Sequence, residues 1–88
     1  MTTHADEAGV ELAALADYLA QGGVTQLAIV ESVIGRYHLE VLLTWKARRC
    51  PLVAARGGPR TFRRLETLVR LLRDIGVGNT AIRLELKT

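Results

Sequence analysis

The sequence has little of the material from which disulfide scaffolds, metal centres and membrane spans are built. Its one cysteine, Cys50, excludes an internal disulfide and suits a reducing compartment. Its two histidines, His4 and His38, lie far apart without a paired ligand spacing. No apolar run approaches the roughly 20 residues of a membrane span, and the polar, acidic start of the chain is unlike a secretory signal. We therefore expect a cytoplasmic protein that uses no metal, cofactor or membrane.

Groups that could carry catalysis are equally scarce. Glu31 and Glu40 could approach each other on paired strands, but their sequence surroundings give no reason for a raised pKa. Ser32 has no histidine near it in the sequence, and Cys50 has the setting of a buried strand residue. We therefore expect a protein without enzymatic activity.

The length of 88 residues predicts one domain, 1–88, in which residues 1–5 are loosely held. A domain of this size buries only about 60–65% of the surface of its unfolded chain, so its stability margin is thin. Pairing with a second copy would widen that margin, and we expect a homodimer.

Two segments have the apolar spacing of amphipathic helices. The first runs over residues 6–21 and ends at Gly22-Gly23. The second has Thr61 as a fair N-cap and Gly76 in the position of a Schellman stop. Its apolar arc consists of Phe62, Leu65, Leu68, Val69, Leu72 and Ile75.

Four segments have the pattern of strands: residues 24–32, 37–45, 52–56 and 80–86. Apolar and polar residues alternate in the second, and Pro51 precedes the third, where a proline is least costly. In the last segment Ile82, Leu84 and Leu86 alternate with charged residues, which predicts one buried and one solvated face.

The order α-β-β-β-α-β predicts an α+β fold, a single two-layer domain. We expect a mostly antiparallel four-stranded sheet with helix packing on at least one face. Because a helix precedes the last strand, that strand either runs parallel to its predecessor through a right-handed crossover or pairs at an open edge. The sequence leaves both arrangements open.

Charge is divided unequally along the chain. Residues 1–45 carry six acids and one base, a net charge of −5, whereas residues 46–88 carry eleven bases and three acids, a net charge of +8. Such asymmetry favours contact with phosphate or with an acidic protein surface, and it equally allows one half to neutralise the other within the fold or across a homodimer.

The basic half is densest around a glycine turn that the pattern places directly before the second helix. Glycines at positive φ expose backbone N–H groups, a helix start adds a positive dipole, and nearby arginines add charge, so the turn suits an anion. Its spacing matches neither a Walker loop nor a dinucleotide fingerprint. The residues expected to bind nucleic acid or a partner are Arg48, Arg49, Arg56, Gly57, Gly58, Arg60, Arg63, Arg64 and Arg70.

The few aromatic residues do not predict stacking on unpaired bases. Tyr37 and Trp45 share the most apolar strand face, and Phe62 opens the apolar arc of the second helix. We assign them to core packing, which leaves phosphate or protein contact as the binding mode.

The run from Val53 to Val77 resembles the small ParC-family partition-associated proteins of plasmids and integrative elements. The matching residues are Arg56, Gly57, Arg60 and Phe62 in an Arg-Gly-x-x-Arg-x-Phe turn, followed by a helix that ends before a glycine. The resemblance covers about a third of the chain. It implies a non-enzymatic accessory protein of a mobile genetic element that acts in plasmid partition or maintenance through DNA or partner proteins.

Two functions follow as hypotheses. In the first, a basic accessory domain contacts nucleic acid (DNA) or a nucleoprotein complex through its arginines. In the second, the chain is a protein-binding module, such as an inhibitor of a host defence complex in the manner of anti-CRISPR proteins.

Overall fold

The computed structural model of the protein describes residues 9–55 and 57–88. In these residues the chain forms two helices and six strands around one hydrophobic core. The protein is therefore a single α+β domain, as the sequence predicts. The elements are β1 (Val10–Glu11), α2 (Leu12–Ala20), β2 (Val24–Val33), β3 (Arg36–Leu43), β4 (Cys50–Val53), β5 (Thr61–Phe62), α3 (Leu65–Asp74) and β6 (Ile82–Glu85).

The sheet is mixed rather than mostly antiparallel, and within the described residues it has six strands rather than four. Its order is β1-β4-β3-β2-β6, and β5 pairs with a second part of β3. Strand β3 is antiparallel to β2, β4 and β5, whereas β1 is parallel to β4 and β6 is parallel to β2. The parallel pairs arise because each helix carries the chain over the sheet between two strands that run in the same direction.

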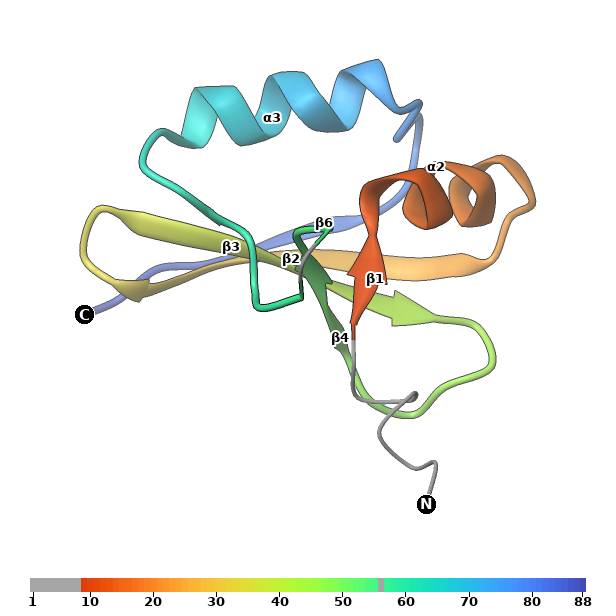
Figure 1. The fold of residues 1–88 in the computed structure, drawn as a ribbon, viewed down its shortest axis with the longest axis horizontal. Coiled ribbons are helices and arrows are strands. Elements are labelled where there is room, and N and C mark those ends of the chain that lie inside the picture. Colours follow the sequence, from red (N-terminus) through yellow and green to blue (C-terminus); the bar gives the residue numbers. More distant parts are fainter. Residues whose placement is uncertain (1–8, 56) are drawn as a thin grey trace.

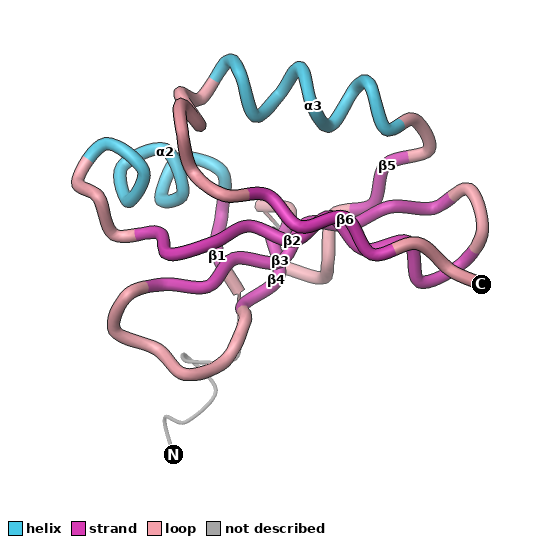
Figure 2. The backbone as a smooth tube through the Cα atoms, turned by 180° about the vertical axis from the view of Figure 1, so that it is seen from behind, coloured by secondary structure: helices cyan, strands magenta, loops and turns pink. Residues whose placement is uncertain are grey.

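Both helices cover the same face of the sheet, so the domain has two layers (Figures 1 and 2). The core lies between them. Leu15 of α2 and Leu68 and Leu72 of α3 are buried against the inward side chains of the central strands. These strand residues are Leu27, Ile29, Leu39, Val41, Leu43 and Leu52, and their alternation confirms the period of two in the sequence.

Each helix ends in a Schellman motif. At the end of α3 the N–H of Gly76 donates to the carbonyl of Arg73 and that of Val77 to the carbonyl of Leu72, at 3.1 and 3.0 Å. Gly76 has φ +85°, which only glycine adopts readily, so the predicted stop is confirmed. The same bonds close α2 through Gly22 and Gly23.

Both helices begin later than their patterns predict. Helix α2 starts at Leu12 because Val10 and Glu11 pair with β4 as a short strand, while residues 6–8 lie outside the described residues. Thr61 is not an N-cap: it lies in β5, and Arg64 holds the N-cap of α3. Helix α3 starts after this segment because Phe62 is held in β5: its ring is buried in the core and its backbone pairs with Tyr37.

Two apolar groups lie outside the core, contrary to their patterns. Ile82, Leu84 and Leu86 are 43, 49 and 56% exposed because β6 lies at the edge of the sheet. Trp45 is 56% exposed because β3 ends at Leu43, and its ring packs edge-on against Tyr18 with the centroids 5.1 Å apart.

In the described part of the chain, no helix has the length and apolarity needed to cross a bilayer.

The entry into β1 depends on Gly9, and we predict that replacing it is costly. Gly9 has φ +93°, and a Cβ there would overlap Cγ1 of Val53 and lie 2.6 Å from the carbonyl oxygen of Pro51. Gly9→Ala should lower the free energy of unfolding by about 2–5 kcal/mol, from backbone strain and overpacking together. Gly35→Ala is the matched control, since Gly35 has φ +82° but open space around it, and it should cost about 1 kcal/mol. Urea denaturation measures both, and equal losses would contradict the tight contact at Gly9.

Candidate nucleic-acid interface

The glycine turn is the tip of a small hairpin that leaves the sheet between β4 and β5. Both strands run beside β3, β4 opposite Glu40 and Val41 and β5 opposite Tyr37 and His38. The chain between them folds out and back, with a bridge between Val53 and Pro59. Strands β4 and β5 therefore form one interrupted edge of β3, and the hairpin is an excursion from it.

Inside this hairpin the backbone bonds to itself. The N–H of Gly57 donates to the carbonyl of Ala54 at 2.8 Å, and the N–H of Ala54 donates to the carbonyl of Gly58 at 3.1 Å. Gly57 and Gly58 have φ of +83° and +73°, which explains why glycine stands at both positions. Arg56 is a predicted site residue that lies outside the described residues.

The predicted anion cradle, a glycine turn joined to a helix start, is therefore not formed. The N–H of Gly57 is already used within the turn, and β5 separates Gly58 from the first residue of α3, Leu65. The expectation failed because Thr61 and Phe62 have the residue types of a helix start but are held as a strand by β3.

What the fold does gather is an arginine cluster of Arg36, Arg60, Arg63 and Arg64. Tyr37 pairs with Phe62, so Arg36, at the start of β3, and Arg63, directly after β5, both flank the last pair of these strands. The Arg60 guanidinium lies over the Phe62 ring, 5.2 Å from its centroid. Arg64 follows as the N-cap of α3, with no side-chain hydrogen bond at that cap.

Most of this cluster has no close counter-charge in the part of the chain that the structure describes. Arg64 lies 3.7 Å from Glu66, but both side chains are exposed, where an ion pair contributes little. No carboxylate of the described residues lies within 4.0 Å of Arg36, Arg60 or Arg63. The charges of Arg36, Arg60 and Arg63 are therefore not neutralised by any carboxylate of the described residues.

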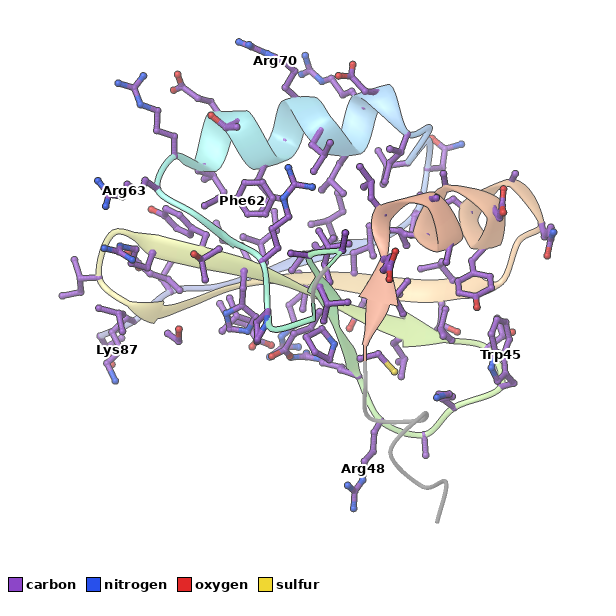
Figure 3. The ribbon with its side chains drawn as sticks, in the orientation of Figure 1. Trp45, Arg48, Phe62, Arg63, Arg70 and Lys87 are labelled. Atoms are coloured by element: carbon purple, nitrogen blue, oxygen red, sulfur yellow. The ribbon has the colours of Figure 1, made fainter. Side chains whose placement is uncertain are left out.

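Arg36 and Lys87 also lie at this end of the molecule, and neither is among the residues selected from the sequence pattern. The backbone N–H of Lys87 donates to the Glu31 carboxylate at 3.2 Å, and Glu31 pairs with Tyr37. Figure 3 shows Lys87 and Arg63 at the same end of the sheet. Only the pairing of strands could have revealed this, since the residues come from three separate segments.

The other predicted site residues lie elsewhere. Arg48 is exposed in the turn between β3 and β4, far from Arg63, and Arg70 projects from the outer side of α3 (Figure 3). Arg70 lines a shallow groove along α3 together with Leu65, Glu66, Val69 and Arg73. Arg60, Arg63 and Arg64 thus lie in the one segment between the glycine turn and α3, whereas Arg48 and Arg70 lie apart from it.

Arg49 is held in an ion-pair network on the sheet face opposite the helices. Its guanidinium donates to Glu85 at 2.8 and 3.1 Å and to Glu40 at 3.2 Å, so it links β6 to β3 across β2. Arg83 contacts Glu85 at 2.7 Å, and His38 contacts Glu40 at 2.8 Å. These carboxylates raise the pKa of Arg49. Its charge is therefore neutralised within the protein rather than offered to a ligand.

A depression of about 460 Å³ adjoins this network, lined by Ser32, His38, Glu40, Arg49, Pro51, Pro59 and Thr61. It places Ser32 and His38 in one depression, which their sequence positions did not indicate. Among the described residues no hydrogen bond joins these two side chains, because His38 is engaged by Glu40. No group of three metal-ligating side chains occurs in the described part of the chain.

The ion-pair network is expected to change how the free energy of unfolding depends on pH in the acid range. Hydrogen bonding to Arg49 is the main cause that holds the pKa of Glu85 below its ordinary value of 4.5, with a smaller contribution from Arg83. Arg49 lowers this pKa more than Arg83 does, although the Arg83 contact is shorter, because Arg49 binds both carboxylate oxygens of Glu85. A depressed pKa adds stability above pH 4.5 that is lost as the pH falls through the folded-state value.

Arg49→Gln should therefore raise the pKa of Glu85 toward 4.5 and weaken the loss of stability below that pH. Arg83→Gln, the matched control, should raise this pKa less. Titration of the Glu85 carboxyl carbon by NMR measures both shifts. A larger shift in the Arg83 variant would contradict the assignment of Arg49 as the main partner.

Comparison with known proteins leaves the resemblance to the ParC family a prediction. No family model, curated protein or solved structure matches this chain. The role in plasmid partition thus continues to rest on the short motif within residues 53–77.

Proposed function

We propose that the arginine cluster binds the phosphate backbone of a nucleic acid, and that the chain is a non-enzymatic accessory protein of DNA or of a nucleoprotein complex. The observation that carries this proposal is the separation of the arginines into two kinds. Arg49 and Arg83 are paired with carboxylates, whereas Arg36, Arg60 and Arg63 have none within 4.0 Å among the described residues. Unpaired exposed guanidinium groups at one end of a domain are suited to phosphate oxygens.

The cluster is also partly held in place, which favours binding. Stacking on Phe62 restrains the Arg60 guanidinium, and strand pairing with Val33 fixes the backbone of Arg36. A side chain that is already restrained loses less conformational entropy when it binds. The uncapped start of α3 beside Arg64 adds backbone N–H groups of favourable polarity.

The aromatic residues favour contact with the backbone over stacking on bases. Phe62 is buried, Tyr37 is partly buried against the core, and Trp45 packs on Tyr18. Without an aromatic platform in the cluster, recognition would depend on charge and the spacing of phosphates. We therefore propose a duplex rather than an unpaired strand as the ligand.

The biological setting follows the resemblance described above. A ParC-like accessory protein would act in the cytoplasm, on a plasmid or integrative element, in partition or maintenance. Phosphate contact by a small basic domain is compatible with that role because it needs no sequence readout by the domain itself.

A protein partner is the second candidate, and one observation favours it. Val33 and Ile34, at the turn between β2 and β3 next to Arg36, are 61 and 75% exposed. An apolar tip beside arginines is a common composition for the centre of a protein interface. An inhibitor of a host defence complex would use such a surface.

Binding of a short fluorescent DNA duplex at several salt concentrations tests the proposal. The double variant Arg60→Ala/Arg63→Ala should weaken binding and reduce the slope of log affinity against log salt by up to about 1.8, or ~0.9 for each lost phosphate contact. The control is Arg48→Ala, another exposed arginine that lies far from the cluster (Figure 3), which should leave the slope unchanged. Fluorescence anisotropy gives the affinities, and thermal melting verifies that both variants fold.

Two results would refute the proposal. Equal losses in the control and the double variant would mean that charge alone, without the cluster, drives binding. No binding of the wild-type protein at low salt would favour the protein-partner function.

A further inference from the structure

Strand β6 has one edge that no other strand of the described residues uses. On its inner side, the N–H of Leu27 donates to the carbonyl of Ala81 at 2.9 Å, and the pairing of β6 with β2 continues through Glu85. Backbone N–H and C=O groups alternate in direction along a strand. Those of the odd-numbered residues of β6 therefore point toward β2. The N–H and C=O groups of Ile82, Leu84 and Leu86 therefore point outward, where they form a template for another strand.

The side chains at this edge make its exposure unusual. Ile82 and Leu84 pair with Leu27 and Ile29, so they lie on the face that the helices cover. Leu27 and Ile29 are buried, but Ile82, Leu84 and Leu86 are about half exposed. Edge strands are normally protected by charge, proline or a bulge on the exposed side, and an apolar row along such an edge points to a partner.

We infer that this edge pairs antiparallel with β6 of a second copy, so that two sheets join into one. With Leu84 opposite the second copy's Leu84, Ile82 is opposite Leu86, and Arg83 is opposite Glu85 of the other copy. One Leu84–Leu84 contact, two Ile82–Leu86 contacts and two Arg83–Glu85 pairs then arise from one strand, because antiparallel pairing of identical strands repeats each off-axis contact across the two-fold axis.

Neighbouring registers lack this complementarity. A shift in one direction sets Arg83 against the second copy's Arg83, and a shift in the other sets Glu85 against Glu85. Like charges directly opposite each other destabilise a strand pair. The charge order of β6 therefore selects a second copy and one register, rather than an unrelated strand in any register.

The proposed pairing agrees with the rest of the fold. The outward backbone groups of Ile82, Leu84 and Leu86 would form about six main-chain hydrogen bonds in this register, two for each facing pair. Because paired residues share a face, both copies of α3 would lie on the same side of the joined sheet. The Arg83 side chain is 62% exposed, so it remains able to reach a second carboxylate beyond its own Glu85.

Disulfide trapping tests the pairing and its register together. In a Cys50→Ala background, Leu84→Cys should crosslink to itself under mild oxidation, because facing Cα atoms lie about 5.5 Å apart, within disulfide range. Ile82→Cys alone should not crosslink, whereas a mixture of Ile82→Cys and Leu86→Cys should. All three replace an exposed apolar residue at the same edge, so each controls for the others.

Efficient crosslinking through Ile82→Cys alone, or none through Leu84→Cys, would overturn the register.

Sedimentation analysis tests the interface without a covalent bond. The wild-type protein should dimerise with rising concentration, Leu84→Asp should be monomeric, and Ile34→Asp should dimerise like the wild type, since Ile34 is also apolar and is even more exposed but lies outside β6. A monomeric wild type, or a dimer that survives Leu84→Asp but not Ile34→Asp, would refute the inference. A wild-type dimer broken only at Leu84 would support it.

Discussion

Pairing of β3 along both of its edges is the constraint on which the rest of the structure depends. One edge is occupied by β2 over nearly its whole length, and the other is shared between β4 and β5. Two of the β3 side chains that face the helices, Leu39 and Val41, are completely buried. Strands β4 and β5 can both pair with this edge of β3 only if the chain between them leaves the sheet and returns. The glycine hairpin is that excursion.

This constraint also explains where the arginines lie. If Thr61 and Phe62 had begun the helix, the arginines around them would surround a helix start next to the glycine turn. Because β3 holds these two residues as a strand, Arg63 is carried to the end of the sheet beside Arg36. The strand pairing that buries Phe62 therefore also assembles the arginine cluster, and Phe62 in turn supports Arg60 by stacking.

The parts of the fold that depend on local pattern could be predicted from the sequence. The alternation in β3, the apolar stripe of α3 and the glycine at its end are each encoded within a few residues. Strands β1 and β5 could not be predicted, because each consists of two residues that are extended only through pairing with distant partners. The same holds for Arg49: its partner Glu85 is 36 residues away, so its selection as a binding residue could not take account of its neutralisation. Local charge density in the sequence was thus enough to find part of the cluster. Which arginines are paired with carboxylates depends on the strand register, which the sequence does not reveal.

The two proposed surfaces are geometrically related through β6. Because β6 is parallel to β2, its carboxyl end lies at the same end of the sheet as the turn before Arg36. Antiparallel pairing of two β6 strands reverses one copy relative to the other, so a dimer would carry its two arginine clusters at opposite ends of the joined sheet. If the clusters bind phosphate as proposed, the two of them would engage two separate nucleic-acid segments, or distant parts of one bent segment, rather than adjacent phosphates. The linkage of two binding sites in one rigid body would then raise the overall affinity wherever both segments are held at the matching separation.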